Sequence, residues 1–359
     1  MLRLAFVGPL WNGGTSVQRL HAFQRVQGLL VMSLDTGERC NDATIVDRVA
    51  HKLRRPIDWS DLNGRVRSLA AKMRPDVMFF DNVKVIQHTT LQGLRDEQHV
   101  APVYYTPDNV IAAHNSSRQL EASWRQWSVV FTTKNFNIPD FVARGVRNAH
   151  LIGNAFDTDI HRPMDRDEVG PDYERFDVVF AGYIEQERRC AINDLAAKGL
   201  QVVVYGDIRQ WGHMHPNVTL RPPAYHLDYC RAMHTGKVAL CFLRKLNRDV
   251  VTTRSIEIPA MGRPMVAERT VEHSSSFEDG REYLGFSSTL ELSTAVQTLL
   301  ANDGLRSLIA TRGRQRCVAS GYSTDDRARE MVDVILAATA QSERQRLATA
   351  TPTLASTAR

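Results

Sequence analysis

Short apolar runs rich in β-branched residues alternate with stretches of helical periodicity throughout the first half of the chain. Such alternation predicts βαβ units, in which helices cover both faces of a parallel sheet. We expect strands at Leu4–Val7, Leu29–Ser33, Val77–Phe80, Val103–Tyr105, Val129–Thr132 and His150–Ile152. We expect helices between them at Val17–Gln27, Thr44–Leu53, Leu62–Met73, Ser117–Trp127 and Pro139–Arg144.

A polar run without periodicity, residues 157–175, interrupts this pattern and contains two prolines and a glycine, as a linker does. The alternation then restarts, with strands expected at Asp177–Ala181, Val202–Tyr205, Val218–Leu220, Val238–Phe242 and Pro264–Ala267. A helical run follows from Thr289 to Ala338. We therefore predict one Rossmann-like domain over 1–156, a linker over 157–175, a second such domain over 176–322 and a helix over 323–341. The Ala- and Thr-rich tail, 342–359, is expected to be disordered.

The composition fits two soluble domains in 359 residues, with 43% hydrophobic and 24% charged residues. A net charge of +5 favours anionic ligands or an acidic membrane face, and is too scattered to indicate nucleic acid. No amphipathic anchor stands out, no apolar run approaches the ~18 residues of a membrane span, and no signal peptide is evident, so we expect a cytoplasmic protein. The five cysteines include no C-x-x-C pair, which argues against a disulfide framework or a zinc site.

The most informative stretch runs from Arg254 to Phe286. Arg254 and Glu257 are one helical turn apart and therefore share a face. At the mouth of a parallel sheet, a cation and a carboxylate suit a ligand with a phosphate at one end and hydroxyls at the other, such as a nucleotide-sugar. The alternative is an exposed ion pair on a surface helix.

The motif R-x-x-E-I-P-A-x-G over 254–262 resembles the CgeB-type glycosyltransferases, which have the GT-B fold. The stretches 104–108 and 180–189 resemble the same family at the corresponding points of its two domains. The resemblance covers roughly residues 100–325. It implies an α/β fold of two doubly wound parallel-sheet domains facing a central cleft. It also implies a nucleotide-diphosphate-sugar donor held by the C-terminal domain and an acceptor on the N-terminal side.

The resemblance also assigns donor-binding roles. It implies that Glu257 accepts hydrogen bonds from the donor ribose, that Arg254 faces the diphosphate, and that Asp249 is a paired acid. Either Arg188 or Arg189 would lie against the phosphates, and the sequence favours neither. The remaining donor-side candidates are Gly182, Tyr205, Gly206, Asp207, Lys245 and Thr270, with Gly13 and Gly14 in the first domain as sites of close backbone approach.

Three polar residues of the first domain are candidates for the acceptor base. Asp81 and Asp108 follow predicted strands, and His114 lies nearby. An inverting transferase requires such a base, whereas a retaining one does not. No D-x-D element stands out, so we expect neither a catalytic metal nor a cofactor other than the nucleotide-sugar co-substrate.

These features predict a metal-independent glycosyltransferase of the hexosyltransferase class, acting in polysaccharide or glycoconjugate biosynthesis. The acceptor hydroxyl could belong to a glycan, a lipid-linked intermediate, a protein or a small molecule, and transient peripheral membrane contact is compatible with the charge. The alternatives are a nucleotide-sugar epimerase and a catalytically inert nucleotide- or glycan-binding module. A Rossmann dehydrogenase is disfavoured because the dinucleotide glycine pattern is missing.

Overall fold

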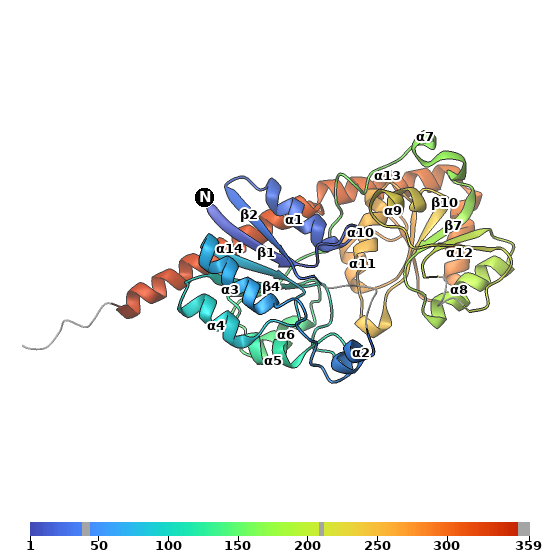
Figure 1. The fold of residues 1–359 in the computed structure, drawn as a ribbon. Coiled ribbons are helices and arrows are strands. Elements are labelled where there is room, and N and C mark those ends of the chain that lie inside the picture. The colour runs from blue at the N-terminus through green and yellow to red at the C-terminus, as the bar shows by residue number, and fades with distance from the viewer. Residues whose placement is uncertain (38–43, 208–211, 351–359) are drawn as a thin grey trace, which may run out of the picture. The chain divides into compact units, whose positions relative to one another are not determined.

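The computed structural model describes residues 1–37, 44–207 and 212–350, with side chains described as far as residue 341 (Figure 1). The chain divides into two compact units. Unit 1 comprises Met1–Ile152 and the chain from Ala328, and unit 2 is Gly153–Arg327. This division places residues 157–175 in unit 2, whereas the sequence suggested a separate linker there.

Unit 1 contains a six-stranded parallel sheet in the order β2-β1-β3-β4-β5-β6. Its strands are β1 Leu2–Gly8, β2 Leu29–Asp35, β3 Val77–Asp81, β4 Ala101–Thr106, β5 Val129–Thr132 and β6 Ala149–Leu151. Its helices before residue 152 are α1 Thr15–Arg25, α2 Ile45–Lys52, α3 Leu62–Met73, α4 His88–Asp96, α5 Arg118–Ser123, the short η1 Trp124–Gln126, and α6 Asn137–Ala143.

Strand alternation divides the unit 1 core into two layers. On one face Phe6 stacks on Phe79 at 5.4 Å between ring centroids, and Phe23 of α1 packs edge-on against Phe79 at 4.9 Å. On the other face Phe80 and Tyr104 pack with tryptophans of the α5–η1 region under α3, α4 and α6. All of β3 is buried, as expected for a central strand covered on both sides.

Unit 2 repeats this architecture with the strand order β12-β11-β10-β7-β8-β9, again entirely parallel. Its strands are β7 Phe176–Ala181, β8 Val202–Tyr205, β9 Val218–Arg221, β10 Gly236–Cys241, β11 Met265–Glu268 and β12 Leu284–Phe286. Its helices are α7 Arg166–Val169, η2 Gly170–Asp172, α8 Gln186–Ala197, α9 His226–Met233, η4 Lys245–Asn247, α10 Thr253–Ala260, α11 Val271–Ser276, α12 Thr289–Ala301 and α13 Asp303–Ala319. The predicted doubly wound α/β class is confirmed in both units.

Two contacts show how unit 2 is held together at its centre. A Cβ on Gly236 would lie 2.6 Å from Cβ of Val179, so only glycine lets β10 lie this close to β7. The buried His234 donates from Nδ1 to the carbonyl of Cys230 (2.7 Å) and accepts at Nε2 from the Met164 N–H (3.1 Å). Burial and the charge of Arg263 lower the pKa of His234 to about 4, so this ring is neutral. It joins the segment before β7 to α9.

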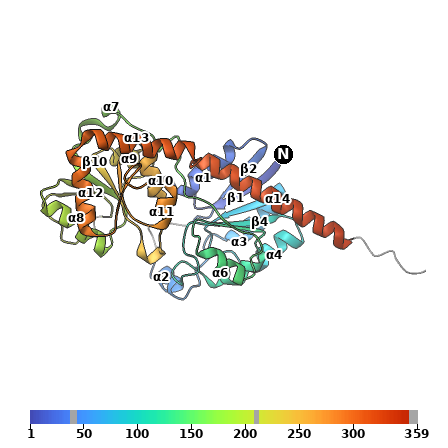
Figure 2. The ribbon, with the colours of Figure 1, turned by 180° about the vertical axis from the view of Figure 1, so that it is seen from behind.

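The final helix, α14 Thr324–Ala350, packs on unit 1. Its residues Ala328, Met331, Val332, Ile335 and Ala338 recur with helical period and join the Phe6–Phe79 face of the sheet, across which α14 runs (Figure 2). The helix extends to Ala350, whereas the sequence suggested a disordered tail from residue 342; residues 351–359 lie outside the described part. The run predicted from Thr289 is divided because Asn302 caps α13, accepting from the Leu305 N–H at 2.9 Å.

Candidate functional site

The strand order of unit 2 identifies where a ligand site is expected. From β7 the chain moves outward through β8 and β9 on one side, and then through β10, β11 and β12 on the other. The order therefore reverses between β7 and β10. In open α/β sheets the crevice outside the carboxyl ends of such strands is the usual binding site. The loop after β7, the helix α8 and the helix α10 begin there.

Gly182 follows β7 directly and adopts a backbone φ of +155°. Its N–H donates to the Tyr205 carbonyl at 2.9 Å. A Cβ at this position would lie 3.2 Å from Cζ of Phe180 and 3.8 Å from Cζ of Arg254. The positive φ and the tight contact with Phe180 both favour glycine here, and the Arg254 guanidinium lies near this end of β7.

Arg188 is the inward-pointing member of the two candidate arginines of α8. It is 6% exposed and donates from Nη1 to the carbonyl of Tyr183 at 2.8 Å. Its Nε and Nη2 are buried without a hydrogen-bond partner among the described residues, and the Glu185 carboxylate lies 3.9 Å from Nη2. Burial lowers the pKa of Arg188. Arg189 is partly exposed and its guanidinium lies beside Gly212.

Arg254 lies in the first turn of α10 and carries a second buried guanidinium N–H. Its Cζ lies 5.7 Å from the centroid of the Tyr229 ring. Within the described residues its side chain makes no hydrogen bond or ion pair, and its Nε is buried. Buried N–H groups of a cation are costly unless they are hydrogen-bonded. Arg188 and Arg254 together therefore fit an anionic ligand that accepts several hydrogen bonds.

Glu257 lies one turn beyond Arg254 and is 6% exposed. Its Oε1 is 3.6 Å from Nε2 of His161, a buried residue of the segment before β7. Nδ1 of His161 accepts from the Asp157 N–H at 2.9 Å, which leaves the ring proton on Nε2, toward Glu257. Burial lowers the pKa of His161 against the opposing effects of Glu257 and Asp157, so the ring is a neutral donor.

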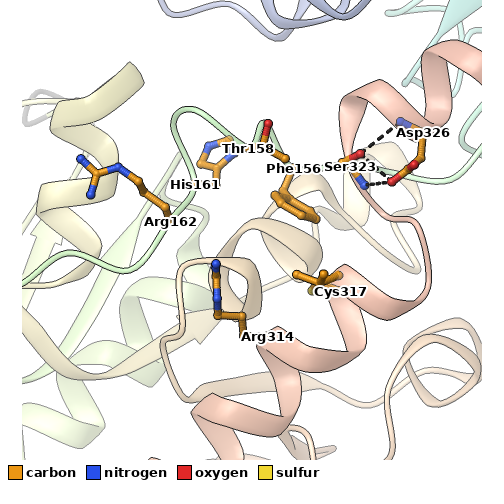
Figure 3. Close-up of a pocket in the computed structure, with 9 residues that line it drawn as sticks. Phe156, Thr158, His161, Arg162, Arg314, Cys317, Ser323 and Asp326 are labelled. Carbon is orange, nitrogen blue, oxygen red and sulfur yellow. Dashed lines mark hydrogen bonds between the residues drawn. The ribbon is translucent and has the colours of Figure 1, made fainter.

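His161 also borders a pocket of about 180 Å³. Figure 3 shows Phe156 and Cys317 in its wall, with Arg314 beside them. Arg314 donates to the carbonyl of Ala260 at the end of α10. None of the predicted donor-binding residues lines this pocket.

A hydrogen-bonded chain fixes the start of α10. The Thr252 N–H donates to Oγ of Ser255 (3.1 Å), and Ser255 donates to Nε2 of His273 (2.6 Å). Nδ1 of His273 in turn donates to the carbonyl of Glu268 at 2.6 Å, at the end of β11. Thr270 caps α11 and donates to the carbonyl of Val250 at 2.7 Å, so its hydroxyl holds the loop before α10.

Several other predicted donor-side residues are engaged by their own surroundings. The Tyr205 hydroxyl accepts from Nη1 of Arg221 at 3.1 Å, and the Gly206 N–H donates to the Arg221 carbonyl at 3.1 Å. Asp249 accepts from Nδ2 of Asn247 at 2.8 Å and closes its own loop. Lys245 is exposed and pairs with Glu187, and Asp207 is partly exposed. Among the described residues, the side chains of Tyr205 and Lys245 form no hydrogen bond or ion pair with Arg188 or Arg254.

In unit 1 the strand order reverses between β1 and β3, where the predicted acids lie. Asp81 is buried and accepts from both Nε (2.8 Å) and Nη2 (3.0 Å) of Arg19, whose guanidinium covers the Tyr105 ring at 4.1 Å. Asp108 is partly exposed and accepts from Nδ2 of Asn82 at 3.1 Å. His114 is exposed. Of the two acids, Asp81 is paired with Arg19, whereas Asp108 forms no ion pair with a described residue.

The glycines of the first loop have a conformational role. Gly13 has a φ of +101°, and Gly14 caps α1 and donates to the carbonyl of Trp11 at 3.2 Å.

Across the described parts of the chain, no group of three or more His, Cys, Asp or Glu residues has a geometry that could hold a metal ion. Nor does any described helix have the length and apolarity needed to cross a membrane.

Comparisons with known proteins agree with this fold. Residues 187–333 match the family model described as "Glycosyl transferase-like". A comparison with curated proteins gives no match.

Solved structures match over almost the entire chain. HepE from Anabaena, solved in complex with UDP-glucose, is 12% identical, with a TM-score of 0.66 over 94% of this chain and 100% of HepE. Sucrose-phosphate synthase from Thermosynechococcus elongatus is 14% identical, with a TM-score of 0.65 over 98% and 100%. A UDP-GlcNAc 2-epimerase from Neisseria meningitidis bound to UDP-GlcNAc is 12% identical, with a TM-score of 0.55 over 94% and 100%. The fold is of the GT-B type.

The sequence did not single out His161 or Tyr229, although both adjoin the Arg254–Glu257 pair. His161 lies in a polar, aperiodic run and far from Glu257 along the chain, so no spacing linked them. The one available signal was the position of His161 four residues after Asp157, whose backbone it accepts from.

Arg263 and Arg254 of unit 2 are expected to differ in their effect on the free energy of unfolding. Arg263 pairs with Glu174 at 2.9 Å and donates to the Gly236 carbonyl at 2.5 Å, so Arg263→Met should lower the free energy of unfolding by about 2–3 kcal/mol. Arg254 has no such partner, so Arg254→Met should stay within about 1 kcal/mol of the wild type or exceed it. Urea unfolding of both variants without ligand tests this. A loss for Arg254→Met as large as that for Arg263→Met would show that Arg254 is structural.

Proposed function

We propose that this protein is a GT-B glycosyltransferase that moves a sugar, a hexose by preference, from a nucleoside-diphosphate donor to a hydroxyl acceptor without a metal ion. The observation that carries the proposal is a pair of arginines at the carboxyl ends of the central strands of unit 2, with the buried Glu257 beside them. Arg188 is buried and Arg254 is partly exposed, and the Nε of each is buried without a hydrogen-bond partner among the described residues. The motif over 254–262 and the family match over 187–333 support it.

The chemistry follows from the charge that develops during transfer. Breaking the bond between the sugar and the diphosphate leaves negative charge on the departing phosphate. Cations already held in place stabilise this charge without reorganising. Arg188 and Arg254 supply charge-assisted donors for it, and because they are buried, water screens them less. In this proposal no cation other than the protein's own is required.

Glu257 would recognise the nucleoside through the ribose. A carboxylate accepts from two hydroxyls at once. Nε2 of His161 lies 3.6 Å from Oε1, so His161 would help to position this carboxylate. Asp108 would receive the proton of the acceptor hydroxyl if the reaction inverts the sugar. Asp81 is a weaker candidate because both of its oxygens are bound by Arg19.

An epimerase is the second candidate, because the Neisseria meningitidis epimerase shares the fold and was solved with UDP-GlcNAc. Its TM-score of 0.55 is lower than the 0.66 of HepE, and the family model that matches is a transferase one. Both comparisons support a nucleotide-sugar ligand.

The test of the proposed function is incubation with a panel of UDP-, GDP-, ADP- and dTDP-sugars. We expect one donor class to release its nucleoside diphosphate slowly in water and faster when sugar hydroxyl acceptors are added, with no loss of rate in EDTA. An epimerised donor would favour the epimerase, and binding without turnover would favour an inert module. No binding of any nucleoside diphosphate would contradict the site itself.

The role of Glu257 predicts a specific loss of ribose recognition. Wild-type protein should bind the preferred nucleoside diphosphate about tenfold more tightly than its 2′-deoxy or 3′-deoxy form, and Glu257→Ala should bind both forms equally weakly. Calorimetric titration measures both. Asp249→Ala is the matched control, because that carboxylate is bonded within its own loop. Unchanged discrimination in Glu257→Ala would remove Glu257 from the site.

His161 offers a prediction that separates positioning from folding. Asn at this position keeps an acceptor for the Asp157 N–H but has no donor that reaches Glu257, whereas Gln places an N–H near the position of Nε2. If His161 positions Glu257, His161→Asn should weaken nucleoside diphosphate binding about tenfold and His161→Gln should retain most of it. If His161→Asn bound more tightly than His161→Gln, and the affinities ranked in the same order as the unfolding midpoints, His161 would only support the chain around Asp157.

A further inference from the structure

An exposed apolar and basic surface lies on unit 1, formed by α2 and the segment that follows it. Six large apolar side chains between residues 45 and 59 are 40–76% exposed. They are Ile45, Val46, Val49, Leu53, Ile57 and Trp59. Contiguous exposed apolar side chains on a protein surface are typical of interaction sites, whereas single ones are common everywhere.

The helix presents these side chains in a fixed order. Ile45, Val49 and Leu53 are spaced four residues apart and so form one stripe, while Ala50, on another side of the helix, is buried against the unit. Thr44 and Asp47 form a capping box, with bonds of 3.2 and 2.9 Å that fix the start of α2. The stripe is thus part of a folded element and not of a frayed end.

Trp59 is tied to the same helix. Its Nε1–H donates to Oδ1 of Asp47 at 2.7 Å, while 71% of the residue remains exposed. The bond ties the exposed indole to α2 through Asp47, which lies on another side of the helix from the stripe. Amphipathic aromatic rings of this kind are enriched where proteins meet the interfacial region of a bilayer.

Three exposed cations lie close to the stripe. Arg48, Lys52 and Arg55 are exposed, and their side chains form no ion pair within the described residues. On the helical wheel Arg48 and Lys52 border the stripe beside Ile45.

The nearby acids bond to backbone N–H groups or to Trp59 instead of pairing with these cations. Asp58 accepts from the Leu62 N–H at 2.7 Å, and Asp61 accepts from the Gly64 N–H at 3.2 Å. Hydrogen bonds from Trp59 and Thr44 lower the pKa of Asp47, whose carboxylate caps α2. The three cations therefore remain available to a partner.

We propose that this surface docks unit 1 on a bilayer that contains anionic lipids, with the apolar stripe entering the interface and Arg48, Lys52 and Arg55 contacting lipid phosphates. Charge complementarity selects this occupant, because a second copy of the chain would bring like charges face to face. The sequence did not reveal the surface, since α2 is one short helix and Trp59 joins it only in the fold. The proposal does not depend on the enzymatic activity.

The test is co-sedimentation of the full chain with vesicles of phosphatidylcholine alone or with phosphatidylglycerol in a 3:1 mixture. We expect binding to the anionic vesicles that weakens with salt, and little binding to phosphatidylcholine alone. Changing Ile45, Val49 and Leu53 to Ser, or Arg48 and Lys52 to Glu, should lower the partition coefficient about tenfold. Vesicle binding should shift the fluorescence of Trp59 to the blue, and Trp59→Phe should remove that shift.

The matched control changes three exposed apolar residues elsewhere, Val142, Leu290 and Leu308, to Ser. It should bind vesicles as the wild type does, and all variants should keep the wild-type unfolding midpoint. Equal sedimentation of the wild type and both surface variants, or no sedimentation of the wild type at low salt, overturns the proposal. A concentration-dependent dimer that the Ser variant abolishes, without vesicle binding, would assign the surface to a second copy instead.

Discussion

Unit 2 depends on one constraint, which is that guanidinium N–H groups of Arg188 and Arg254 are buried at the end of its sheet without hydrogen-bond partners among the described residues. Two other arginines lie in direct ion pairs, the partly exposed Arg19 with Asp81 and the buried Arg263 with Glu174. At the end of β7, Arg188 bonds to the Tyr183 carbonyl and lies 3.9 Å from the Glu185 carboxylate, while Arg254 packs on an aromatic ring. A protein that keeps buried N–H donors without hydrogen-bond partners is organised for a ligand rather than for maximal stability.

The surrounding structure explains how this arrangement is held. The Ser255–His273–Glu268 chain fixes the start of α10 to the end of β11. His161, buried and neutral, aligns Glu257 from a segment far away in the sequence. The hydrogen bonds of the Ser255–His273–Glu268 chain and the position of His161, 3.6 Å from Glu257, are present before any ligand arrives.

Much of the fold could be predicted from the sequence because buried parallel strands form short apolar runs that local patterns reveal. The Arg254–Glu257 pair was also predictable, since helical spacing places both on one face. Other features depend on contacts that no local pattern encodes. The stripe on α14 predicts a buried helix but not which sheet it covers, and α4 was missed because its sequence, with Gly93 and a threonine pair, lacks a clear apolar period. Likewise, adjacent Arg188 and Arg189 differ only in the direction that α8 gives them.

The most direct measurement is a crystal structure of the chain with the nucleoside diphosphate that it binds best. We predict phosphate oxygens within hydrogen-bond distance of Nε of Arg254 and of Nε or Nη2 of Arg188, with the ribose hydroxyls on Glu257. A nucleotide bound instead at the exposed basic loop around Lys245, or at the Arg19–Asp81 pair of unit 1, with the two buried guanidinium groups untouched, would contradict the central claim.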